Sequence, residues 1–526
     1  MTPSAKQPSV AVAGGGLAGL AAACALADAG FRVTLLERRP YLGGRASSYE
    51  HPGTGEIVDN CQHVLLGCCT NLIDFYRRTG AEEKIRWYDE LVFLEPGGRA
   101  SYIKPSFLPA PLHTGPSFLR AACLGWRDKL AIARAMMVLS GILGDEQADP
   151  FLVRQEGRLA PRDSGQSFLQ WLEQHGQTEL AIDRFWKTIL VSALNEDLDR
   201  MSVPYAAQVV RESFLKSPAA GRMGVPTVPL TDLYNAAGNY IHEHGGELRV
   251  RCSLETFRAD RDQIHVQVSS KDVGTSEEVF DYLVLALPFD GVDRVLPIVP
   301  EATPLREMLT HFESSPITGI HLWFDRQISE LDHAVLLDRT IQWMFHKSRL
   351  QPMRTQGGKN SARDSDAPYS ETNREGHEST RAASASSSDA ASAAEVGSYV
   401  ELVVSSSKSL IDRSRPEIIE LALRELREFF PEAKAAQLVK STVIKELHAT
   451  YSPRPGIDAY RPGAATAWPR VFLAGDWTNT GWPATMEGAV RSGYMAAEAL
   501  ARASGAARSK FLMPDLPATG LMRLLT

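Results

Sequence analysis

A run of polar and sulfur-bearing side chains near the N-terminal end has the residue types for acid–base chemistry. It reads Asp59-Asn60-Cys61-Gln62-His63, and a Cys68-Cys69 pair follows. An imidazole titrates near neutrality and can give a proton, so His63 is the first candidate for a general acid. Gln62 can orient a polar group of a substrate, and Asp59 is expected to hold the local strand by hydrogen bonding.

Metal binding and simple packing are the other interpretations of this run. Thiols and imidazoles are zinc ligands, but the spacing matches no common zinc site, and we expect no metal. Free cysteines are often small buried hydrophobic residues, which suits Cys68 and Cys69. Packing suits Gln62 and His63 less well, because a polar pair in an apolar stretch must find hydrogen-bond partners or a substrate.

A strand, a glycine-rich turn and a helix are predicted ahead of this run. Val10–Ala13 has the apolar pattern of a buried strand, and 17–29, rich in Ala and Leu, that of a helix. Gly14 allows a tight turn, Gly16 lets a pyrophosphate approach the backbone, and Gly19 lets the helix pack on the strand. The free N–H groups of the helix then favour phosphate, so the pattern predicts a dinucleotide site.

Further segments strengthen that prediction. A second apolar strand, 31–36, ends at Glu37, close to the spacing at which an acid binds an adenosine ribose, and Gly43-Gly44-Arg45 comes next. Near the other end of the chain, an apolar strand ends in Gly475-Asp476, whose carboxylate can bind cofactor oxygens. The stretch 481–493 then opens a helix that can direct its N-terminus toward a cofactor.

The glutamate followed by Gly-Gly-Arg, together with the distant Gly-Asp segment, resembles the large flavoprotein family of amine oxidases, protoporphyrinogen oxidase and phytoene desaturases. The resemblance implies an α/β fold with FAD as cofactor. A Rossmann-like FAD-binding domain of the amine oxidase or glutathione-reductase type would be interleaved with an α+β substrate domain. The residues expected at the cofactor are Gly14, Gly16, Leu17, Ala18, Gly19, Glu37, Arg38, Gly44, Arg45, Ala46, Leu254, Ala286, Gly475, Asp476, Ala484, Thr485, Met486 and Ala489.

The 526 residues are therefore divided by segment rather than by length alone. Strand patterns at 245–254, 263–268 and 280–288 are expected to return the chain to the cofactor domain. We assign 8–70, 220–300 and 468–505 to the FAD-binding domain, 71–219 and 301–467 to the substrate domain, and 506–526 to a C-terminal tail. Residues 351–396 form a low-complexity insert that lacks the apolar residues to order itself, in a hairpin between strands 341–345 and 399–404.

Composition limits the partners and the compartment. With 44% hydrophobic residues and a net charge of −7, the chain gives no electrostatic indication of nucleic-acid binding. Its six cysteines come without a secretory signal, so reduced thiols and a cytoplasmic location are expected. The stretch 117–143 mixes apolar and basic residues, and the tail carries an apolar run. Both are candidates for peripheral contact with the inner face of the plasma membrane, but for 117–143 a pair of core helices is the preferred interpretation.

The Asp-Asn-Cys-Gln-His run departs from the Asp, Gly, His pattern of the wider family. With Gly475–Ala489, it resembles the squalene-associated, desaturase-like branch, the bacterial hydroxysqualene dehydroxylases. That resemblance implies reduction of hydroxysqualene to squalene in hopanoid biosynthesis, with an external electron donor and squalene-synthase-like enzymes as partners. Cys61, Gln62 and His63 would then lie at the reacting centre, with His63 as the acid and Glu487 as the second candidate.

Three other functions are compatible with the sequence. A carotenoid or phytoene-type desaturase would transfer hydride from substrate to FAD, the opposite direction. An amine oxidase would need aromatic side chains at the flavin, for which Trp468, Trp477 and Trp482 are candidates. A prenyl-lipid carrier of the same fold would bind no flavin and would not need the complete set of cofactor residues.

Overall fold

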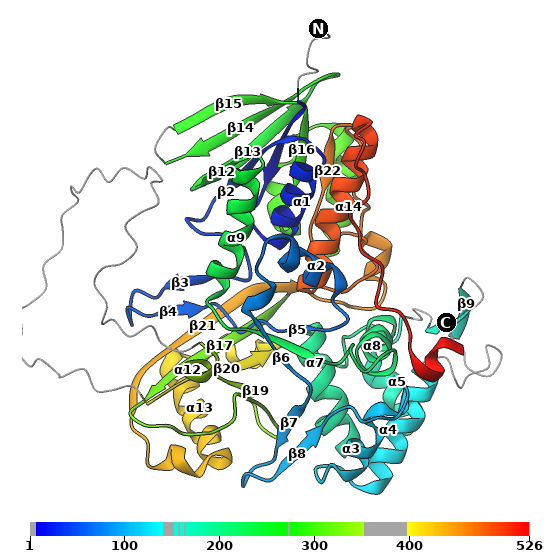
Figure 1. Ribbon diagram of the computed structural model, residues 1–526, viewed down its shortest axis with the longest axis vertical. Coiled ribbons are helices and arrows are strands. Elements are labelled where there is room, and N and C mark those ends of the chain that lie inside the picture. The colour runs from blue at the N-terminus through cyan, green and yellow to red at the C-terminus, as the bar shows by residue number, and fades with distance from the viewer. Residues whose placement is uncertain are drawn as a thin grey trace, which may run out of the picture.

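The computed structural model describes residues 7–139, 152–155, 158–161, 165–271, 274–351 and 397–524 (Figure 1). The predicted insert, apart from Gln351, lies outside these residues. The fold class is α/β, as predicted. A parallel sheet with helices and a larger, mostly antiparallel sheet occupy opposite ends of the long axis in Figure 1.

The parallel sheet has five strands in the order β12-β2-β1-β16-β22, drawn from three distant parts of the chain. Neighbouring strands are parallel, with Ala13 of β1 in register with Leu36 of β2 and Leu285 of β16. Nearly all side chains of four of these strands are buried, as expected for a sheet covered on both faces, whereas those of the edge strand β12 are exposed or partly exposed. The strands are β1 (Ser9–Ala13), β2 (Arg32–Glu37), β12 (Glu247–Val250), β16 (Tyr282–Leu285) and β22 (Val471–Leu473).

Helix α1 (Leu17–Asp28) follows the glycine-rich turn and is buried on nearly every side. Helix α14 (Met486–Ser504) packs along it so closely that a Cβ at Gly493 would lie 2.2 Å from the Ala18 carbonyl oxygen. Helix α9 (Leu230–Glu243) covers α1 from another side, and α2 (Thr70–Arg78) contacts the first half of α14. Segments from both ends of the chain thus form one core.

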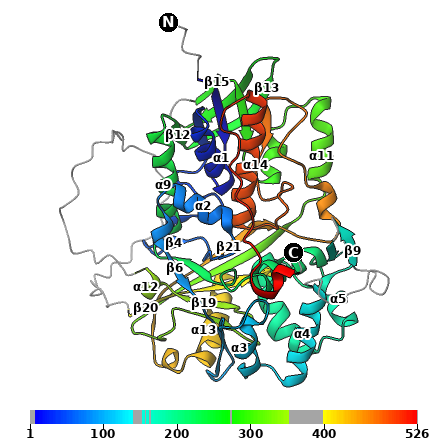
Figure 2. The same ribbon diagram turned by 45° about the vertical axis from the view of Figure 1, so that its right-hand side comes forward.

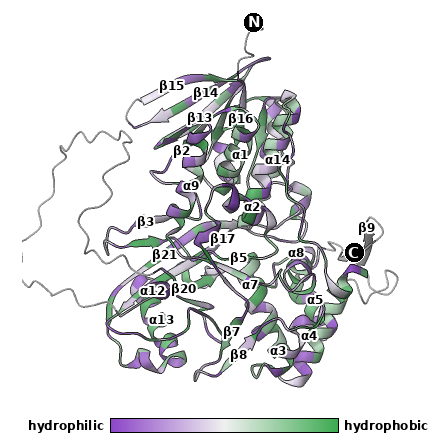
Figure 3. Ribbon diagram, in the orientation of Figure 1, coloured by the Kyte–Doolittle hydropathy of each residue, from purple (hydrophilic) through white to green (hydrophobic). Residues whose placement is uncertain are grey.

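A separate antiparallel sheet is formed by β13 (Cys252–Ala259), β14 (Ile264–Ser270) and β15 (Gly274–Phe280). The sequence predicted β14 but not β15, and its single predicted strand at 245–254 is divided between β12 of the parallel sheet and the start of β13. The β15 residues Gly-Thr-Ser-Glu-Glu-Val-Phe are polar and mostly exposed, because β15 is an edge strand (Figure 3, where it is largely white and purple). The predicted strand at 280–288 is correspondingly shorter and is limited to β16.

The larger sheet has seven strands in the order β21-β17-β20-β19-β18-β7-β8. The hairpin expected around the insert is confirmed, since β19 pairs antiparallel with β20 and Trp343 lies opposite Val403. Its strands are β7 (Leu91–Leu94), β8 (Ala100–Ile103), β17 (Ser314–Phe324), β18 (His333–Leu336), β19 (Trp343–His346), β20 (Ser398–Ser405) and β21 (Leu438–Tyr451). Helix α13 (Arg415–Phe429) packs on this sheet, and the short α12 (Lys347–Leu350) follows β19.

Helices gather beside the larger sheet, at the lower right of Figure 2. The stretch expected to be amphipathic, 117–143, contains two helices in its described part, α3 and α4. The helices are α3 (Gly115–Arg120), α4 (Trp126–Leu139), α5 (Phe168–Gln174), α7 (Thr188–Leu194) and α8 (Val203–Val210). The tail returns along α14 and ends in a short 3-10 helix, Gly520–Leu524, whose Leu521 amide donates to the Ala110 carbonyl.

The polar run Asp59–His63 lies between two short strands at the junction of the two large sheets. It starts at the end of β4 (Ile57–Asp59), which pairs with β3 (Ser48–Glu50). It is followed by β5 (Leu65–Leu66), the edge of a small sheet with β11 (Met223–Pro226) and β6 (Ile85–Tyr88). This segment therefore faces both halves of the molecule.

Candidate functional site

Three adjoining cavities extend from the parallel-sheet half to the boundary with the larger sheet. The glycine-loop cavity, of about 390 Å³, is lined by residues of the β1–α1 turn, the end of β2 and the end of β16. The central cavity, of about 260 Å³, is lined by Asn60–Val64, the start of α14 and the larger sheet. The apolar cavity, of about 200 Å³, extends from there between β5, α7 and α8. Arg45 lines the first two, and Val64, Ser192, Trp343, Thr485 and Met486 line the last two, so the cavities adjoin.

Glycines shape the first cavity. Gly14 has φ +111°, and a Cβ there would lie 2.3 Å from the Ala286 carbonyl oxygen. A Cβ at Gly19 would lie 1.8 Å from the Gly14 carbonyl oxygen, so the helix packs directly on the turn. At Gly16 the nearest atom would be 3.8 Å away, which leaves space for a ligand at the start of α1. No side chain caps that helix, so its first N–H groups are free for an anion.

Glu37 and the Arg45–Asp476 pair define the polar ends of this cavity. Glu37 accepts hydrogen bonds from the amides of Gly15 (2.7 Å) and Arg39 (2.6 Å), which fixes the turn. Each carboxylate oxygen keeps a lone pair for a further donor. Arg45 donates to Asp476 at 2.5 Å and joins segments 431 residues apart at the boundary with the central cavity.

The start of α14 borders the central cavity. The hydroxyl of Thr485 caps the helix by accepting from the Gly488 amide at 3.1 Å. Ala484, Thr485, Met486 and Ala489 line the cavity. Because these are small or apolar side chains at a helix N-terminus, they can pack against a flat ring and direct the positive end of the helix toward it.

Comparison with known proteins identifies the family. Residues 17–501 match the family described as flavin containing amine oxidoreductase, and the chain belongs to that family. It is 26% identical over 504 residues to a 15-cis-phytoene desaturase of Synechococcus elongatus, covering 93% of this chain and 95% of that protein. It is also 26% identical over 507 residues to a probable zeta-carotene desaturase of the same organism, covering 95% and 99%.

Solved structures show the same fold. An oxidoreductase from Methanosarcina mazei has a TM-score of 0.63 at 14% identity, covering 92% of this chain and 98% of that one. A putrescine oxidase has a TM-score of 0.61 at 16% identity, covering 95% and 98%. The protein is thus an FAD-dependent oxidoreductase of the amine oxidase superfamily.

The residues of the first two cavities fit FAD. The open space at Gly16 and the uncapped α1 suit the pyrophosphate, and the free lone pairs of Glu37 suit the ribose. The central cavity at the start of α14 then suits the flavin ring. Of the residues expected at the cofactor, all but Ala18 and Gly19 line one of these two cavities. Those two lie inside α1, where Gly19 serves the close packing of helix on turn.

His63 lines the central cavity, with properties that differ from the simple expectation. Its Nδ1 lies 2.7 Å from the Cys61 carbonyl oxygen, which can only accept, so Nδ1 carries the hydrogen. In the neutral ring Nε2 is then an acceptor. Burial lowers the pKa of His63, so the neutral form dominates at neutral pH and the acidic form is a minor one.

Gln62 and Cys61 complete this wall of the central cavity. Gln62 is buried, and its Nε2 donates to the His63 carbonyl oxygen at 3.0 Å. Burial raises the pKa of the Cys61 thiol well above its ordinary value, so this cysteine stays protonated and is a poor nucleophile. Asp59 holds the segment, as expected, by accepting from the Ser48 hydroxyl (2.5 Å) and the Leu230 amide (3.1 Å).

Two charged residues that sequence reasoning missed lie behind this wall. The ammonium of Lys347, at the start of α12, contacts Asp59 Oδ2 (2.5 Å) and Gln62 Oε1 (2.8 Å). Glu401 of β20 lies 3.5 Å from the same ammonium. Burial opposes ionisation of Asp59, but Lys347 outweighs it and the pKa of Asp59 is lowered. Burial raises the pKa of Glu401 to about 7.

Glu446, on β21, is a third residue missed from the sequence. It lines the central cavity, and its carboxylate lies 3.4 Å from the Asn60 side-chain nitrogen. No sequence signal marks it, since Lys-Glu-Leu-His reads as an ordinary polar strand. The fold alone places this carboxyl opposite the start of α14.

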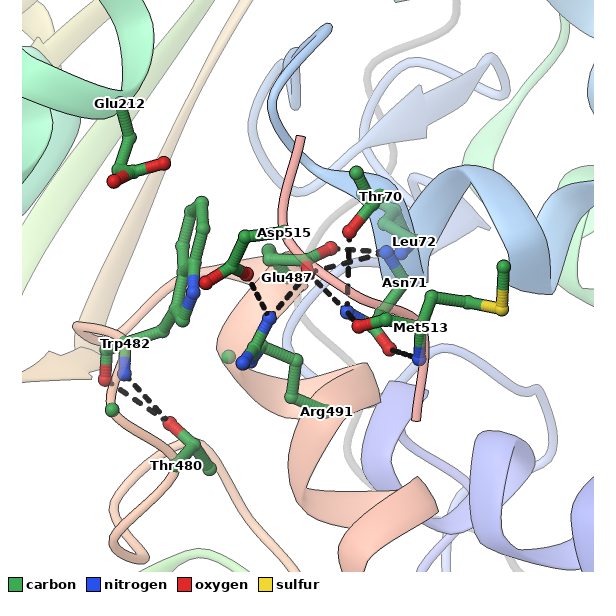
Figure 4. Close-up of polar contacts among 12 residues, drawn as sticks. Thr70, Asn71, Leu72, Glu212, Thr480, Trp482, Glu487, Arg491, Met513 and Asp515 are labelled. Carbon is green, nitrogen blue, oxygen red and sulfur yellow. Dashed lines mark hydrogen bonds and ion pairs between the residues drawn. The ribbon is translucent and has the colours of Figure 1, made fainter. Parts of the chain in front are cut away.

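Glu487 occupies a different position from the one expected of an acid at the reacting centre. It borders the apolar cavity rather than the central one. Its two carboxylate oxygens accept from the amides of Asn71 (3.2 Å) and Leu72 (2.8 Å) in the first turn of α2 (Figure 4). Arg491 lies 3.6 Å away and also pairs with Asp515 of the tail. Glu487 therefore stabilises a helix start and the docked tail.

The remaining candidate side chains lie outside the central cavity. Cys68 and Cys69 line the apolar cavity, in agreement with the packing interpretation. Among the described residues, no group of three His, Cys, Asp or Glu side chains is arranged to hold a metal. None of the three tryptophans considered for an aromatic cage lines the central cavity, where the aromatic side chains are Trp343 and Phe345.

Proposed function

We propose that the protein removes the hydroxyl group of hydroxysqualene and forms squalene, with FAD as the redox cofactor. The observation that carries this proposal is the junction of two cavities. A mostly apolar cavity adjoins the central cavity at Val64, Ser192 and Trp343, and Val64 directly follows the Gln62-His63 pair in the chain. A long hydrocarbon chain with one polar group fits such an arrangement, since each buried methylene contributes roughly 0.8 kcal/mol relative to water.

In this proposal the bound FAD would supply the hydride after reduction by an external electron donor. The chain's own residues bind and activate the alcohol. Hydroxide is a poor leaving group, so the departing oxygen needs hydrogen bonds and a proton. Gln62 donates to that oxygen, and His63 supplies the proton from its minor protonated form. The apolar cavity keeps water away from the carbon centre.

Carotenoid desaturation is the second candidate, and the curated relatives favour it. These relatives are named as desaturases of 15-cis-phytoene and zeta-carotene, and their similarity extends over nearly the whole chain. Such a reaction would use the same apolar cavity but would transfer hydride in the opposite sense. A hydrocarbon substrate gives Gln62 and His63 nothing to bind, which is why we place dehydroxylation first.

One pair of anaerobic experiments separates these functions. The purified holoenzyme is reduced chemically and mixed with hydroxysqualene, and in parallel the oxidised holoenzyme is mixed with phytoene. The proposal predicts squalene and reoxidised flavin in the first mixture and no desaturated product in the second. If phytoene is desaturated and no squalene is formed, the protein is a desaturase, the second candidate. If the purified protein is colourless, the result favours a lipid carrier without flavin.

We also propose that the protein docks on a membrane, where such substrates reside. Around α3 and α4, Phe107, Leu119 and Trp126 are 96%, 69% and 71% exposed. Arg120, Arg127, Lys129 and Arg134 lie on the same two helices, in a chain whose net charge is −7. Apolar side chains among basic ones suit an anionic bilayer surface such as the inner face of a plasma membrane. No helix in the described residues is long and apolar enough to cross a bilayer.

Sedimentation with lipid vesicles tests this docking surface. We expect binding to vesicles that contain phosphatidylglycerol, weaker binding to phosphatidylcholine alone, and a loss of about tenfold for Leu119→Ser/Trp126→Ser. Ile298→Ser is the matched control, because Ile298 is 96% exposed but lies outside α3 and α4. Equal losses in the two variants would contradict the proposal.

A further inference from the structure

A buried ammonium lies directly behind the wall of the central cavity. The side chain of Lys347 is 1% exposed, and those of its partners Asp59 and Glu401 are 2% and 0% exposed. Its third contact is neutral, the Oε1 of Gln62 at 2.8 Å. A buried cation is expensive unless it is paired, and Asp59 and Glu401 provide the pairing. The contact with Gln62 adds little charge compensation, so it calls for another explanation.

This contact fixes which way the amide of Gln62 points. An ammonium has three donors and no acceptor, so the Gln62 atom that faces it must be the oxygen. The amide nitrogen therefore lies on the other side, where one of its hydrogens goes to the His63 carbonyl oxygen at 3.0 Å. The second hydrogen has no partner among the residues that the structure describes. Gln62 itself lines the central cavity.

We infer that Lys347 is a positioning residue that makes Gln62 a hydrogen-bond donor to the oxygen of a substrate alcohol. This inference rests on the proposed function. The ammonium also withdraws electron density from the amide through the Oε1 contact, which strengthens the opposite N–H as a donor. As the carbon–oxygen bond breaks, the oxygen keeps the electron pair, takes up one proton and leaves as water. A fixed donor at this oxygen interacts more strongly as its negative charge grows.

The arrangement suits an alcohol better than a hydrocarbon. An amide hydrogen that faces an apolar ligand without a partner destabilises the complex, because a buried donor loses its bond to water. An apolar residue at position 62 would serve a hydrocarbon substrate and would need no buried lysine. A purely structural role for Lys347 predicts no preference between two ligands that differ only in the hydroxyl group.

Ligand binding to the oxidised holoenzyme tests the inference without any turnover. Hydroxysqualene and squalene are each titrated in detergent micelles, and binding is followed through the visible spectrum of the flavin. We expect wild type to bind the alcohol about tenfold more tightly than the hydrocarbon, the effect of one good hydrogen bond. Gln62→Met should reduce this ratio to about one, because it removes the hydrogen bond to the alcohol and also the unpaired donor that faces squalene.

The variant of Lys347 must keep the buried charges balanced. Lys347→Met alone leaves the buried carboxyl groups of Asp59 and Glu401 without their cation. We therefore combine it with Asp59→Asn, whose Oδ1 can still accept from the Ser48 hydroxyl and the Leu230 amide. This double variant should also bring the ratio to about one. Glu401→Gln is the control, since it changes the same cluster without contacting the Gln62 side chain, and it should keep the tenfold ratio. Bound FAD per chain reports whether each variant is folded.

The possible outcomes separate this inference from the proposed function. A ratio that stays near ten in the folded double variant overturns the role of Lys347, even if wild type makes squalene. A wild type without any preference for the alcohol also overturns it. A ratio that falls in both variants supports the donor, even if squalene is never formed. In that last case the failure lies with the proposed reaction.

Discussion

Two parts of one site are built by different means. The glycine-loop cavity depends on the backbone, with close contacts at Gly14 and Gly19 and an uncapped helix start. The polar wall of the central cavity depends on side chains from β4, α12 and β20 that meet at the Lys347 ammonium. The first part requires particular residues close together in sequence. The second requires particular charges brought together by the fold, so the two should respond differently to mutation.

The largest effect is expected from Gly19→Val, which attacks the backbone part. A Cβ at Gly19 would lie 1.8 Å from the Gly14 carbonyl oxygen, so α1 must move away from the turn that faces the pyrophosphate. We expect FAD affinity to fall by about ten-thousandfold or more, roughly 5.5 kcal/mol, measured as flavin absorbance per purified chain. Gly463→Ala is the control, because its Cβ meets no atom within 4 Å. Normal flavin content in Gly19→Val would show that the close packing is dispensable.

The next largest effect is expected from Lys347→Met, which attacks the side-chain part. Removing one partner of a buried ion pair strands Asp59 in a dry site and typically costs about 3–5 kcal/mol of unfolding free energy. Urea unfolding measures this change. Lys440→Met is matched to it, since Lys440 pairs with Glu56 at 2.6 Å but the side chains are 38% and 36% exposed. Such an exposed pair contributes about 1 kcal/mol or less to the unfolding free energy. Equal losses of unfolding free energy in Lys347→Met and Lys440→Met would contradict the expected difference between the buried and the exposed pair.

This contrast also explains how much the sequence could predict. The strand, turn and helix at 9–28 follow from local apolar patterns and glycine spacing, and the parallel sheet follows from them. Lys347 could not be singled out, because Phe-His-Lys-Ser-Arg has no distinctive pattern and its partners lie 288 and 54 residues away. The role of Glu487 was equally hidden, since its partners Asn71 and Leu72 are more than 400 residues distant. Burial and long-range pairing decide these cases, and neither is encoded locally.

A smaller effect is expected on the pH dependence of the unfolding free energy. The titration of Glu401 should change this free energy by on the order of 3 kcal/mol. Burial raises its folded-state pKa from 4.5 to about 7. Between these values the folded state holds a proton that the unfolded chain releases, so the unfolding free energy falls as the pH rises from about 4.5 to about 7. Glu401→Gln should remove this slope, so the variant gains stability over wild type at pH 8 relative to pH 5. The measurement is urea unfolding of both proteins across this pH range. If the unfolding free energies of wild type and Glu401→Gln change with pH in parallel, Glu401 does not titrate as a buried group.

The smallest of these effects is expected on turnover, from replacement of His63, which lines the central cavity. His63→Ala should keep the flavin but lower turnover of hydroxysqualene by about a hundredfold, or 2.7 kcal/mol, as for loss of a general acid. Burial lowers the pKa of His63, so its protonated form increases only as the pH falls below the ordinary range for histidine. Wild-type turnover should therefore rise as the pH falls from 8 toward 5, and His63→Ala should lose this rise. If the rise persists in the variant, the proton comes from another group of the central cavity, and Glu446 would be the carboxyl to replace next.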